Sequence, residues 1–331
     1  MKKYYMAVDA GGSKVHLLLF DAEFNRIDFG IAASSNPNVV PISEISRNMA
    51  KTYEWLFDRN PEIRHFSGIY ICSLCPAEIL LEPMKEFSVT YENVCTIDEG
   101  RMGMYACCRS ENAVVTLSGT GSDVYCIEKG ELCPGTVGGW GAIVADEGSG
   151  YWIGREAMIA AIHDYELRGE KTLLTRMIME RLYPDDFPKS IFSVYESSSP
   201  VRGVAAMSRM VDAAARKGDH AAIDIFCRAA HLLAVQVRTI YMRIPESVSY
   251  PLLVTGGSWK NHLLFDRFQM EIGQLYPGKV VEEPVFEPIV GGVFYYMRQC
   301  GLSDEEAKRL LLQNFAVDRY IIQDHCPGQY E

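Results

Sequence analysis

The stretch that decides the fold runs from Val114 to Ile153 and reads VVTLSGTGSDVYCIEKGELCPGTVGGWGAIVADEGSGYWI. Its start, Val114 to Leu117, is an apolar run bounded by a glycine turn, which predicts a buried strand. Residues 118–122 then read SGTGS, and the two glycines let backbone N–H groups face inward beside three hydroxyls. Such a turn makes a nest for an anionic oxygen, typically that of a phosphate.

A second glycine-rich segment follows in the same stretch. Residues 138–141 read GGWG and residues 146–149 read DEGS, so glycines, a tryptophan and two acids gather just before an apparent helix. Either piece alone fits a hairpin turn. Both together, with the acids and the tryptophan in place, favour a binding site.

The bulk composition limits the class of protein. A chain of 331 residues suggests two domains, and 48% hydrophobic with 23% charged residues gives ample material for a core. The net charge of −11 argues against a nucleic-acid or membrane-surface partner. No stretch reaches the roughly 18 apolar residues of a membrane span, and the N-terminus is too short for a signal-peptide core. We expect a cytoplasmic protein whose ten scattered cysteines are buried thiols.

The N-terminal part predicts three short strands, over residues 4–8, 15–20 and 26–32. The first turn reads DAGGSK, from Asp9 to Lys14, with a carboxylate at a strand end followed by two glycines, a hydroxyl and a lysine. This composition suits a magnesium–phosphate group, with the acid toward the metal and the backbone N–H groups toward phosphate oxygens. A plain Gly-Gly hairpin turn is the competing interpretation.

Strands alternate with helices in the next part. Residues 66–72 and 93–97 read as strands around a helix over 77–87, and the second strand ends at Asp98. This alternation predicts an α/β unit, in which ligands gather at the carboxyl ends of strands. Asp98 lies at such an end, although a lone Asp there is more often a helix cap. Asn36, in a polar loop before a helix over 43–57, is either a ligand-binding residue or part of an Asn-Pro turn.

After the central stretch the chain is mostly helical. We expect helices over residues 150–165, 171–182, 201–216 and 220–243, with a break at Lys217-Gly218-Asp219. A strand over 252–255 leads into Gly256-Gly257-Ser258 and a helix over 259–275. Strand, glycine pair and helix favour a bound anion, but the spacing is neither that of a Walker loop nor that of a dinucleotide fingerprint.

Three glycine turns after strands, in the order DAGGSK, SGTGS and TGGS, resemble those of the actin-like ATPase superfamily of sugar kinases. Within it, the combination SGTGS…GGWG…DEGSGYWIG resembles the BadF/BadG/BcrA/BcrD ATPase family, and specifically its N-acetylglucosamine kinase branch. The resemblance covers most of the chain, from Asp9 to about Gly292.

This resemblance implies an α/β, actin-like ATPase (ribonuclease H-like) fold with two domains around a nucleotide and sugar cleft. A small N-terminal domain is expected over residues 1–112, completed by the C-terminal helix 300–316. A larger domain is expected over residues 113–299. The resemblance also suggests a homodimer, ATP and Mg²⁺ as cofactors, and a small-molecule sugar as the substrate.

The resemblance also implies roles for individual residues. Asp98 matches the catalytic base that accepts the proton of the attacking hydroxyl. The implied ATP and magnesium set is Asp9 (the metal ligand), Gly11, Gly12, Ser13, Lys14, Gly119, Thr120, Gly121, Gly218, Gly256 and Gly257. The implied sugar set is Asn36, Asp98, Ser122, Asp123, Trp140, Gly141 and Asp146.

Several positions depart from the family pattern. Asp123 stands where these kinases usually have asparagine, which replaces a hydrogen-bond donor with an acceptor. Glu99 follows Asp98, and a second acid raises the pKa of an aspartate when the carboxylates are close. Ala142 stands where some amino-sugar kinases have a polar residue. These departures bear on the identity of the sugar more than on the reaction.

Two other functions fit the same superfamily. One is an ATPase that activates 2-hydroxyacyl-CoA dehydratases through an iron–sulfur cluster, for which Cys126 and Cys133 lie near the central stretch without a recognisable cluster motif. The other is a non-catalytic sugar sensor that has kept the fold. The leading hypothesis is an ATP-dependent kinase of an amino sugar or hexose, with N-acetylglucosamine as the first candidate.

Overall fold

The computed structural model describes residues 2–37, 40–197 and 199–320, which form two compact units. The first unit comprises residues up to 113 together with residues 127–132 and 283–320. The second comprises residues 114–126 and 133–282. This division differs from the expected one, in which residues 113–299 form the second domain and only 300–316 return to the first.

The first unit is built on a five-stranded sheet in the order β3-β2-β1-β5-β7. Its strands are β1 (Tyr4–Ala10), β2 (Lys14–Asp21), β3 (Arg26–Ala33), β5 (Gly68–Ser73) and β7 (Val94–Thr96). The first three form an antiparallel meander, as expected, and β5 and β7 add to it in parallel with β1. Since a parallel neighbour needs a long crossover, α1 (Ile42–Arg59) connects the meander to β5.

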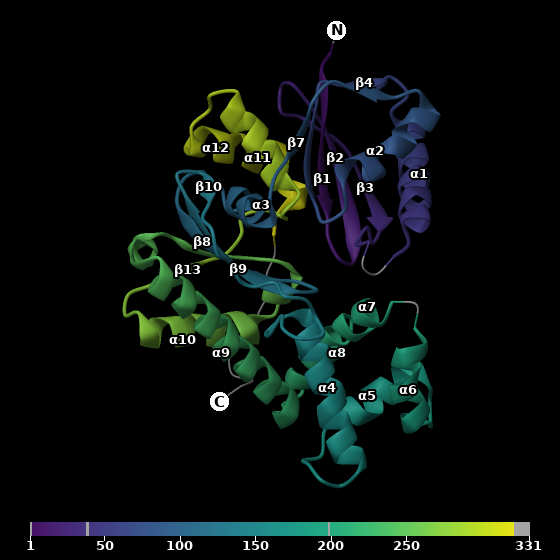
Figure 1. The fold of residues 1–331 in the computed structure, drawn as a ribbon, viewed down its shortest axis with the longest axis vertical. Helices are drawn as coiled ribbons and strands as arrows, with labels where there is room; N and C mark the ends of the chain where they lie inside the picture. Colours follow the sequence, from purple (N-terminus) through teal and green to yellow (C-terminus); the bar gives the residue numbers. More distant parts are fainter. Residues whose placement is uncertain (1, 38–39, 198, 321–331) are drawn as a thin grey trace. The chain divides into compact units, whose positions relative to one another are not determined.

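Helix α1 lies along the meander in Figure 1 and buries one apolar stripe against it. The stripe includes Ile45, Met49 and Leu56, at helical spacing. Gly30 of β3 allows a close approach, because a Cβ there would lie 2.9 Å from Cδ1 of Leu56. The connection to β7 runs through α2 (Ala77–Leu81), and a small sheet pairs β4 (His65–Phe66) with β6 (Thr90–Tyr91).

The C-terminal return completes this unit with α11 (Val290–Gln299) and α12 (Asp304–Asn314). Two adjacent glycines seat α11 against its neighbours. A Cβ at Gly292 would lie 2.9 Å from Cβ of Ala7 in β1, and one at Gly291 would lie 2.4 Å from the Met102 carbonyl oxygen in α3 (Glu99–Ala106). The return therefore begins earlier than residue 300, because the apolar face of α11 packs on the first sheet.

A second sheet has the strand order β10-β9-β8-β12-β13, with β11 paired to β9. Its strands are β8 (Ala113–Ser118), β9 (Ser122–Glu128), β10 (Glu131–Leu132), β11 (Val137–Gly138), β12 (Leu252–Thr255) and β13 (Val281–Glu282). The pairs β8–β12 and β12–β13 are parallel. The strand expected at 114–117 is thus β8, and every residue of β12 is buried.

The helices of the second unit are inserted between β11 and β12 or follow β12. They are α4 (Gly150–Tyr165), α5 (Leu173–Leu182), α6 (Phe187–Glu196), α7 (Pro200–Ala205), α8 (Ser208–Ala215), α9 (His220–Arg243) and α10 (His262–Leu275). Helices α4 to α8 gather as the teal group in Figure 1, while α9 packs along α10. Helix α4 begins where the DEGS segment ends, so the central stretch reaches from β8 to the first turn of this helix.

Candidate active site

Asp9 and Asp98 lie at the same edge of the first sheet. Asp9 is paired in register with Cys72, and the N–H of Ile97 extends the β5–β7 pairing by donating to the Ile71 carbonyl at 2.8 Å. The carboxyl ends of β1, β5 and β7 therefore meet at one edge, which is where α/β sheets place ligands. Burial raises the pKa of the Cys72 thiol well above its usual value, and the negative charges of Asp9, Glu99 and Asp98 add to this shift.

The carboxylate of Asp9 has few groups that favour its ionised form. Burial raises the pKa of Asp9 to about 6; Lys14 opposes this shift and Glu287 adds to it. A carboxylate in that condition is stabilised by a cation, and Mg²⁺ accepts one or two carboxylates together with substrate phosphate oxygens. The donor set of Asp9 with Glu287 nearby therefore fits a magnesium–phosphate group.

A buried serine ties the Asn36 loop to the first glycine turn. The turn is closed by the Gly11 N–H, which donates to the Lys14 carbonyl at 3.1 Å. The Ser34 hydroxyl donates to the Gly12 carbonyl at 2.7 Å and accepts from the Asn36 N–H at 3.3 Å. Asn36 thus lies beside the DAGGSK turn. The sequence did not indicate Ser34, because its partner is distant along the chain.

Asp98 caps a helix, as a lone Asp at a strand end often does. Its Oδ1 accepts from the Arg101 N–H at 2.8 Å, and its Oδ2 accepts from Arg101 Nε at 2.5 Å. Arg101 also reaches Oε2 of Glu131 at 3.3 Å. Arg101 thereby holds the carboxylate of Asp98 in one orientation and has Glu131 as a second carboxylate partner. The sequence did not indicate Arg101.

In the second unit the SGTGS turn meets the start of α4. The Ser118 hydroxyl donates to the Gly148 carbonyl at 2.8 Å, and the Ser122 hydroxyl donates to the Glu147 carbonyl at 2.9 Å. The Gly150 N–H donates to the Gly119 carbonyl at 2.8 Å. The two glycine-rich parts of the central stretch are therefore held together by the hydroxyls and backbone of the turn.

The third glycine turn joins the same cluster. Gly256 has a φ of +105°, and a Cβ there would lie 2.4 Å from the Ser118 carbonyl oxygen. The Ser258 hydroxyl donates to the Gly119 carbonyl at 3.3 Å. Since β8 and β12 are parallel neighbours, their carboxyl ends bring SGTGS and TGGS side by side. Within the turn the Gly119 N–H is occupied, because it donates to the Gly121 carbonyl at 2.8 Å.

Asp146 lies directly against the SGTGS turn. A Cβ at Gly121 would lie 2.8 Å from Asp146 Oδ2, so glycine leaves room for the carboxylate. Asp146 Oδ1 accepts from the Gly141 N–H at 3.1 Å, and the residue is 7% exposed. Burial raises the pKa of Asp146; the Gly141 N–H opposes this shift and the charge of Glu147 adds to it.

Asp123 lies close to the same group from the neighbouring strand. Its Oδ2 accepts from the Tyr125 hydroxyl at 2.9 Å. Burial raises the pKa of Asp123 to about 6, with the Tyr125 hydrogen bond opposing and the charge of Asp146 adding to the shift. Trp140, by contrast, has a side chain that is 80% exposed and follows the glycine pair 138–139. The structure therefore groups Ser122, Asp123, Gly141 and Asp146, while Trp140 faces solvent.

The segment at Gly218 directly follows α8, and this helix is hydrogen-bonded to the start of α10. Gly218 has a φ of +77° and follows α8, whose Asp212 accepts a hydrogen bond from the Asn261 side chain. Asn261 in turn caps α10, shortly after the Gly256-Gly257 turn. Asp219 caps α9 through the Ala222 N–H at 2.9 Å. The segments at Gly218 and at Gly256-Gly257, whose glycines belong to the implied ATP set, are thus connected through Asp212 and Asn261.

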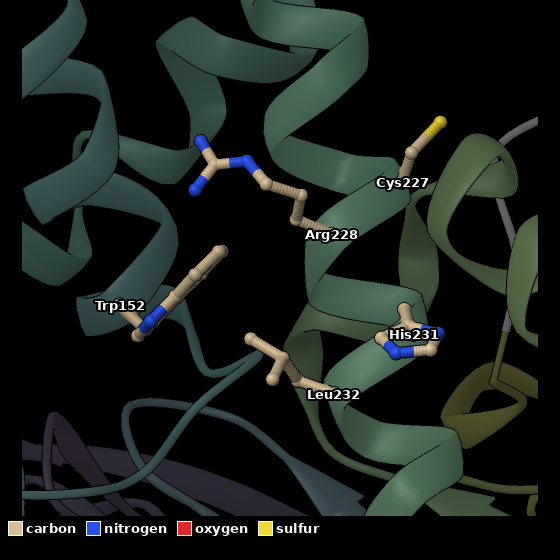
Figure 2. A pocket seen from close by; sticks show the side chains of 5 residues that line it. All are labelled: Trp152, Cys227, Arg228, His231 and Leu232. Atoms are coloured by element: carbon tan, nitrogen blue, oxygen red, sulfur yellow. The ribbon is translucent and has the colours of Figure 1, made fainter.

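A cavity of about 380 Å³ lies elsewhere in the second unit, between α4 and α9. Figure 2 shows Trp152 of α4 facing Arg228 and Leu232 of α9, with Cys227 and His231 completing the lining. Arg228 lies 5.4 Å from the Trp152 ring centroid and pairs with Glu156 at 2.8 Å. None of the residues expected at the site lines this cavity.

Over the described ranges, no group of three or more His, Cys, Asp or Glu side chains could hold a metal ion. Among the described helices, none is both long enough and apolar enough to cross a membrane.

The α/β fold of this chain is shared with solved structures. A candidate N-acetylglucosamine kinase from Porphyromonas gingivalis superposes with a TM-score of 0.70 at 17% identity, over 91% of this chain and 100% of that one. A ROK family glucokinase from Streptomyces griseus superposes with a TM-score of 0.56 at 15% identity, over 90% and 100%.

Residues 7–295 match the profile of the BadF/BadG/BcrA/BcrD ATPase family, and the chain belongs to this family. Use of ATP follows from that membership. The N-acetylmuramic acid/N-acetylglucosamine kinase of Clostridium acetobutylicum is 26% identical over 305 residues, which is 90% of this chain and 99% of that protein. The N-acetyl-D-glucosamine kinase of Dictyostelium discoideum is 26% identical over 318 residues, 88% and 96%.

Proposed function

We propose that this protein transfers the γ-phosphoryl group of ATP to a hydroxyl of an amino sugar. N-acetylglucosamine is the first candidate, and N-acetylmuramic acid is the second because the relative from Clostridium acetobutylicum carries both in its name. The observation that carries the proposal is the contact between Asp146 and Gly121. A sugar hydroxyl bound by Asp146 would lie beside a phosphate bound at the SGTGS turn, which an ATPase without a sugar would not need.

The chemistry can be divided among the residues as follows. Mg²⁺, when bound, would neutralise charge on the phosphate oxygens, and Asp9 would hold it, with Gly11, Gly12, Ser13 and Lys14 binding phosphate. Thr120 and Gly121 would hold the transferred group while Gly119, whose N–H is already used, would shape the turn. Gly218, Gly256 and Gly257 would border the nucleoside. Asp98 would orient the attacking hydroxyl and accept its proton. Asn36, Ser122, Asp123, Trp140, Gly141 and Asp146 would bind the sugar.

Phosphoryl transfer suits such a residue set. Its transition state is loose, so that positioning and charge neutralisation supply most of the acceleration. Arg101 contributes by fixing the carboxylate of Asp98 in one orientation, so the base is positioned before the sugar binds.

The test is ADP release with ATP and Mg²⁺ across a panel of hexoses and N-acetylated amino sugars. We expect stimulation by one sugar in the wild type and a loss of about 100-fold or more in Asp98→Asn, because general base catalysis is removed. Asp58→Asn, an exposed carboxylate on α1, is the matched control and should keep full activity. Turnover of ATP that ignores every sugar would instead indicate an ATPase activator, and sugar binding without turnover would indicate a sensor.

A further inference from the structure

Among the described residues, two hydrogen-bond acceptors near the proposed sugar residues have no partner. The first is Oδ1 of Asp123, which is buried and receives no hydrogen bond. The other oxygen of this carboxylate is occupied by the Tyr125 hydroxyl at 2.9 Å. Tyr125 therefore fixes the orientation of Asp123 and leaves Oδ1 as the open acceptor.

The second acceptor is Oε1 of Gln236, on α9. Gln236 is 7% exposed, and its Nε2 donates to the Glu147 carbonyl at 3.4 Å, so its orientation is fixed by the start of the DEGS segment. Oε1 is buried and has no hydrogen-bond partner within residues 2–37, 40–197 and 199–320. Buried polar atoms are nearly always paired, so an unpaired one calls for an explanation such as a ligand.

Both acceptors lie against the same glycine pair. A Cβ at Gly138 would lie 3.0 Å from Gln236 Oε1. One at Gly139 would lie 2.3 Å from Asp123 Oδ2 and 3.0 Å from Asp123 Oδ1, so the whole carboxylate packs against this glycine. Gly138 is also the register partner of Asp123 in the β11–β9 pairing. Two side chains that are distant in sequence, each with one unpaired oxygen, thus pack against the same glycine pair.

The charged groups around these acceptors, on Asp123, Asp146 and Glu147, are all carboxylates. The carboxylate of Asp146 is close enough to raise the pKa of Asp123, and that of Glu147 raises the pKa of Asp146. In the described part of the chain none of these three carboxylates forms an ion pair with a Lys, Arg or His. The cluster therefore offers acceptors and negative charge, and the Tyr125 hydroxyl is already used.

We propose that Asp123 and Gln236, with Tyr125 as a positioning residue, select sugars that present hydrogen-bond donors and reject sugars that carry a carboxylate here. A sugar amide N–H and a sugar hydroxyl, with one donor each, together satisfy the two open acceptors, whereas a second carboxylate leaves them unpaired and adds repulsion. Since this inference rests on the proposed function, it ranks the two candidate substrates: N-acetylglucosamine is accepted, and N-acetylmuramic acid, which carries a carboxylate, is disfavoured.

The experiment compares kcat/KM for N-acetylglucosamine and N-acetylmuramic acid in the wild type, Asp123→Asn, Tyr125→Phe and the charge-matched control Asp58→Asn. We expect the wild type and the control to prefer the neutral sugar by about 100-fold, and Asp123→Asn to reduce this preference at least about 10-fold, because the amide supplies a donor. Tyr125→Phe keeps the charge, so the preference persists. The hydrogen bond from Tyr125 lowers the pKa of Asp123 in the wild type, so its loss in Tyr125→Phe raises this pKa. We therefore expect the pH dependence of KM to shift to higher pH in this variant.

Calorimetric binding of the same two sugars separates this inference from the proposed function. Selective binding that is lost in Asp123→Asn, without ADP release in any variant, would support the selection and reject the kinase. ADP release with an unchanged preference in Asp123→Asn would keep the kinase and reject the selection. Equal acceptance of both sugars by the wild type, or binding of neither, would also overturn the inference. An unfolding midpoint close to that of the wild type shows that each variant is folded.

Discussion

Asp9 illustrates how the burial of one carboxyl group lowers the stability of the fold at neutral pH. Its carboxylate is half-buried at the end of β1, where burial raises the pKa to about 6. The folded pKa therefore lies above that of the unfolded chain. At pH values between these two pKa values the folded chain carries a proton on Asp9 that the unfolded chain has lost. The free energy of unfolding therefore falls as the pH rises through about 6.

This pKa shift predicts the effect of Asp9→Asn on stability. The amide does not ionise, so we expect the variant to gain about 2 kcal/mol in free energy of unfolding relative to wild type at pH 7.5, and much less at pH 4.5. Urea unfolding in EDTA at the two pH values measures the difference. Asp58→Asn should show no such pH dependence. An equal change at both pH values would contradict the role assigned to burial.

At the scale of elements, close backbone approaches fix how the helices of the second unit pack. A Cβ added to Gly154 of α4 would lie 2.0 Å from the Val204 carbonyl oxygen of α7. This contact is with backbone, which moves less readily than a side chain, so α4 and α7 would have to separate. Gly203, in α7 itself, has open space where its Cβ would be.

These two glycines give a matched pair of substitutions. Gly154→Ala should lower the free energy of unfolding by about 1–3 kcal/mol through overpacking. Gly203→Ala should leave stability unchanged or raise it by up to about 1 kcal/mol, because alanine is the better helix former. Thermal unfolding of both variants makes the comparison. Similar losses in the two would mean that helix propensity, and not the α4–α7 approach, controls the outcome.

Elements with strong local signals were predictable from sequence. The expected helices 150–165 and 220–243 match α4 and α9, because Ser149 and Asp219 cap them as their residue types suggest. The helix expected over 43–57 is α1, which begins at Ile42 after Pro41 and has no side-chain cap. The helix expected over 201–216 is two helices, α7 and α8, and α6 was not foreseen.

The candidate site was predictable to the same degree. Glycine turns and acids carry a local pattern, so Asp9, Asp98 and the SGTGS turn could be named. Ser34, Arg101, Tyr125 and Gln236 could not, because no local pattern distinguishes them from ordinary surface or core residues. Their partners are set by the packing of strands and helices, and for Ser34 and Gln236 these partners are distant in sequence. A polar residue on a long amphipathic helix, such as Gln236, gives no indication of what lies opposite.

At the scale of the whole molecule, the N-terminal hairpin of the first unit is bonded to the C-terminal segment that returns to this unit. Arg26 of β3 forms two hydrogen bonds with Asp318, at 2.7 and 3.1 Å, and Asp318 is 8% exposed. Asn314 adds a bond to the Phe24 carbonyl at 2.8 Å. The β2–β3 hairpin and the end of the C-terminal return are thereby joined by a bidentate, charge-assisted pair.

Removing the Arg26–Asp318 pair should destabilise the C-terminal segment over residues 304–320. We expect Arg26→Gln to lower the free energy of unfolding by about 2–3 kcal/mol, because Asp318 is left buried without its partner. Hydrogen exchange over residues 304–320 should accelerate. Arg176→Gln is the control, since Arg176 and Glu180 are 65% and 64% exposed and such pairs contribute little. Unchanged exchange in Arg26→Gln would show that the Arg26–Asp318 pair does not hold this C-terminal segment in place.

The discontinuity of the first unit has a consequence for synthesis on the ribosome. The β1–β2–β3 meander emerges early, but α11, which packs on Ala7 through Gly292, is translated nearly 300 residues later. At typical translation rates of about 5–20 residues per second, the face of β1 that α11 covers stays exposed on the nascent chain for on the order of 15–60 seconds. The second unit lies between the two parts in the chain and can close first. Nascent chains of this protein should therefore engage holdase chaperones until translation ends.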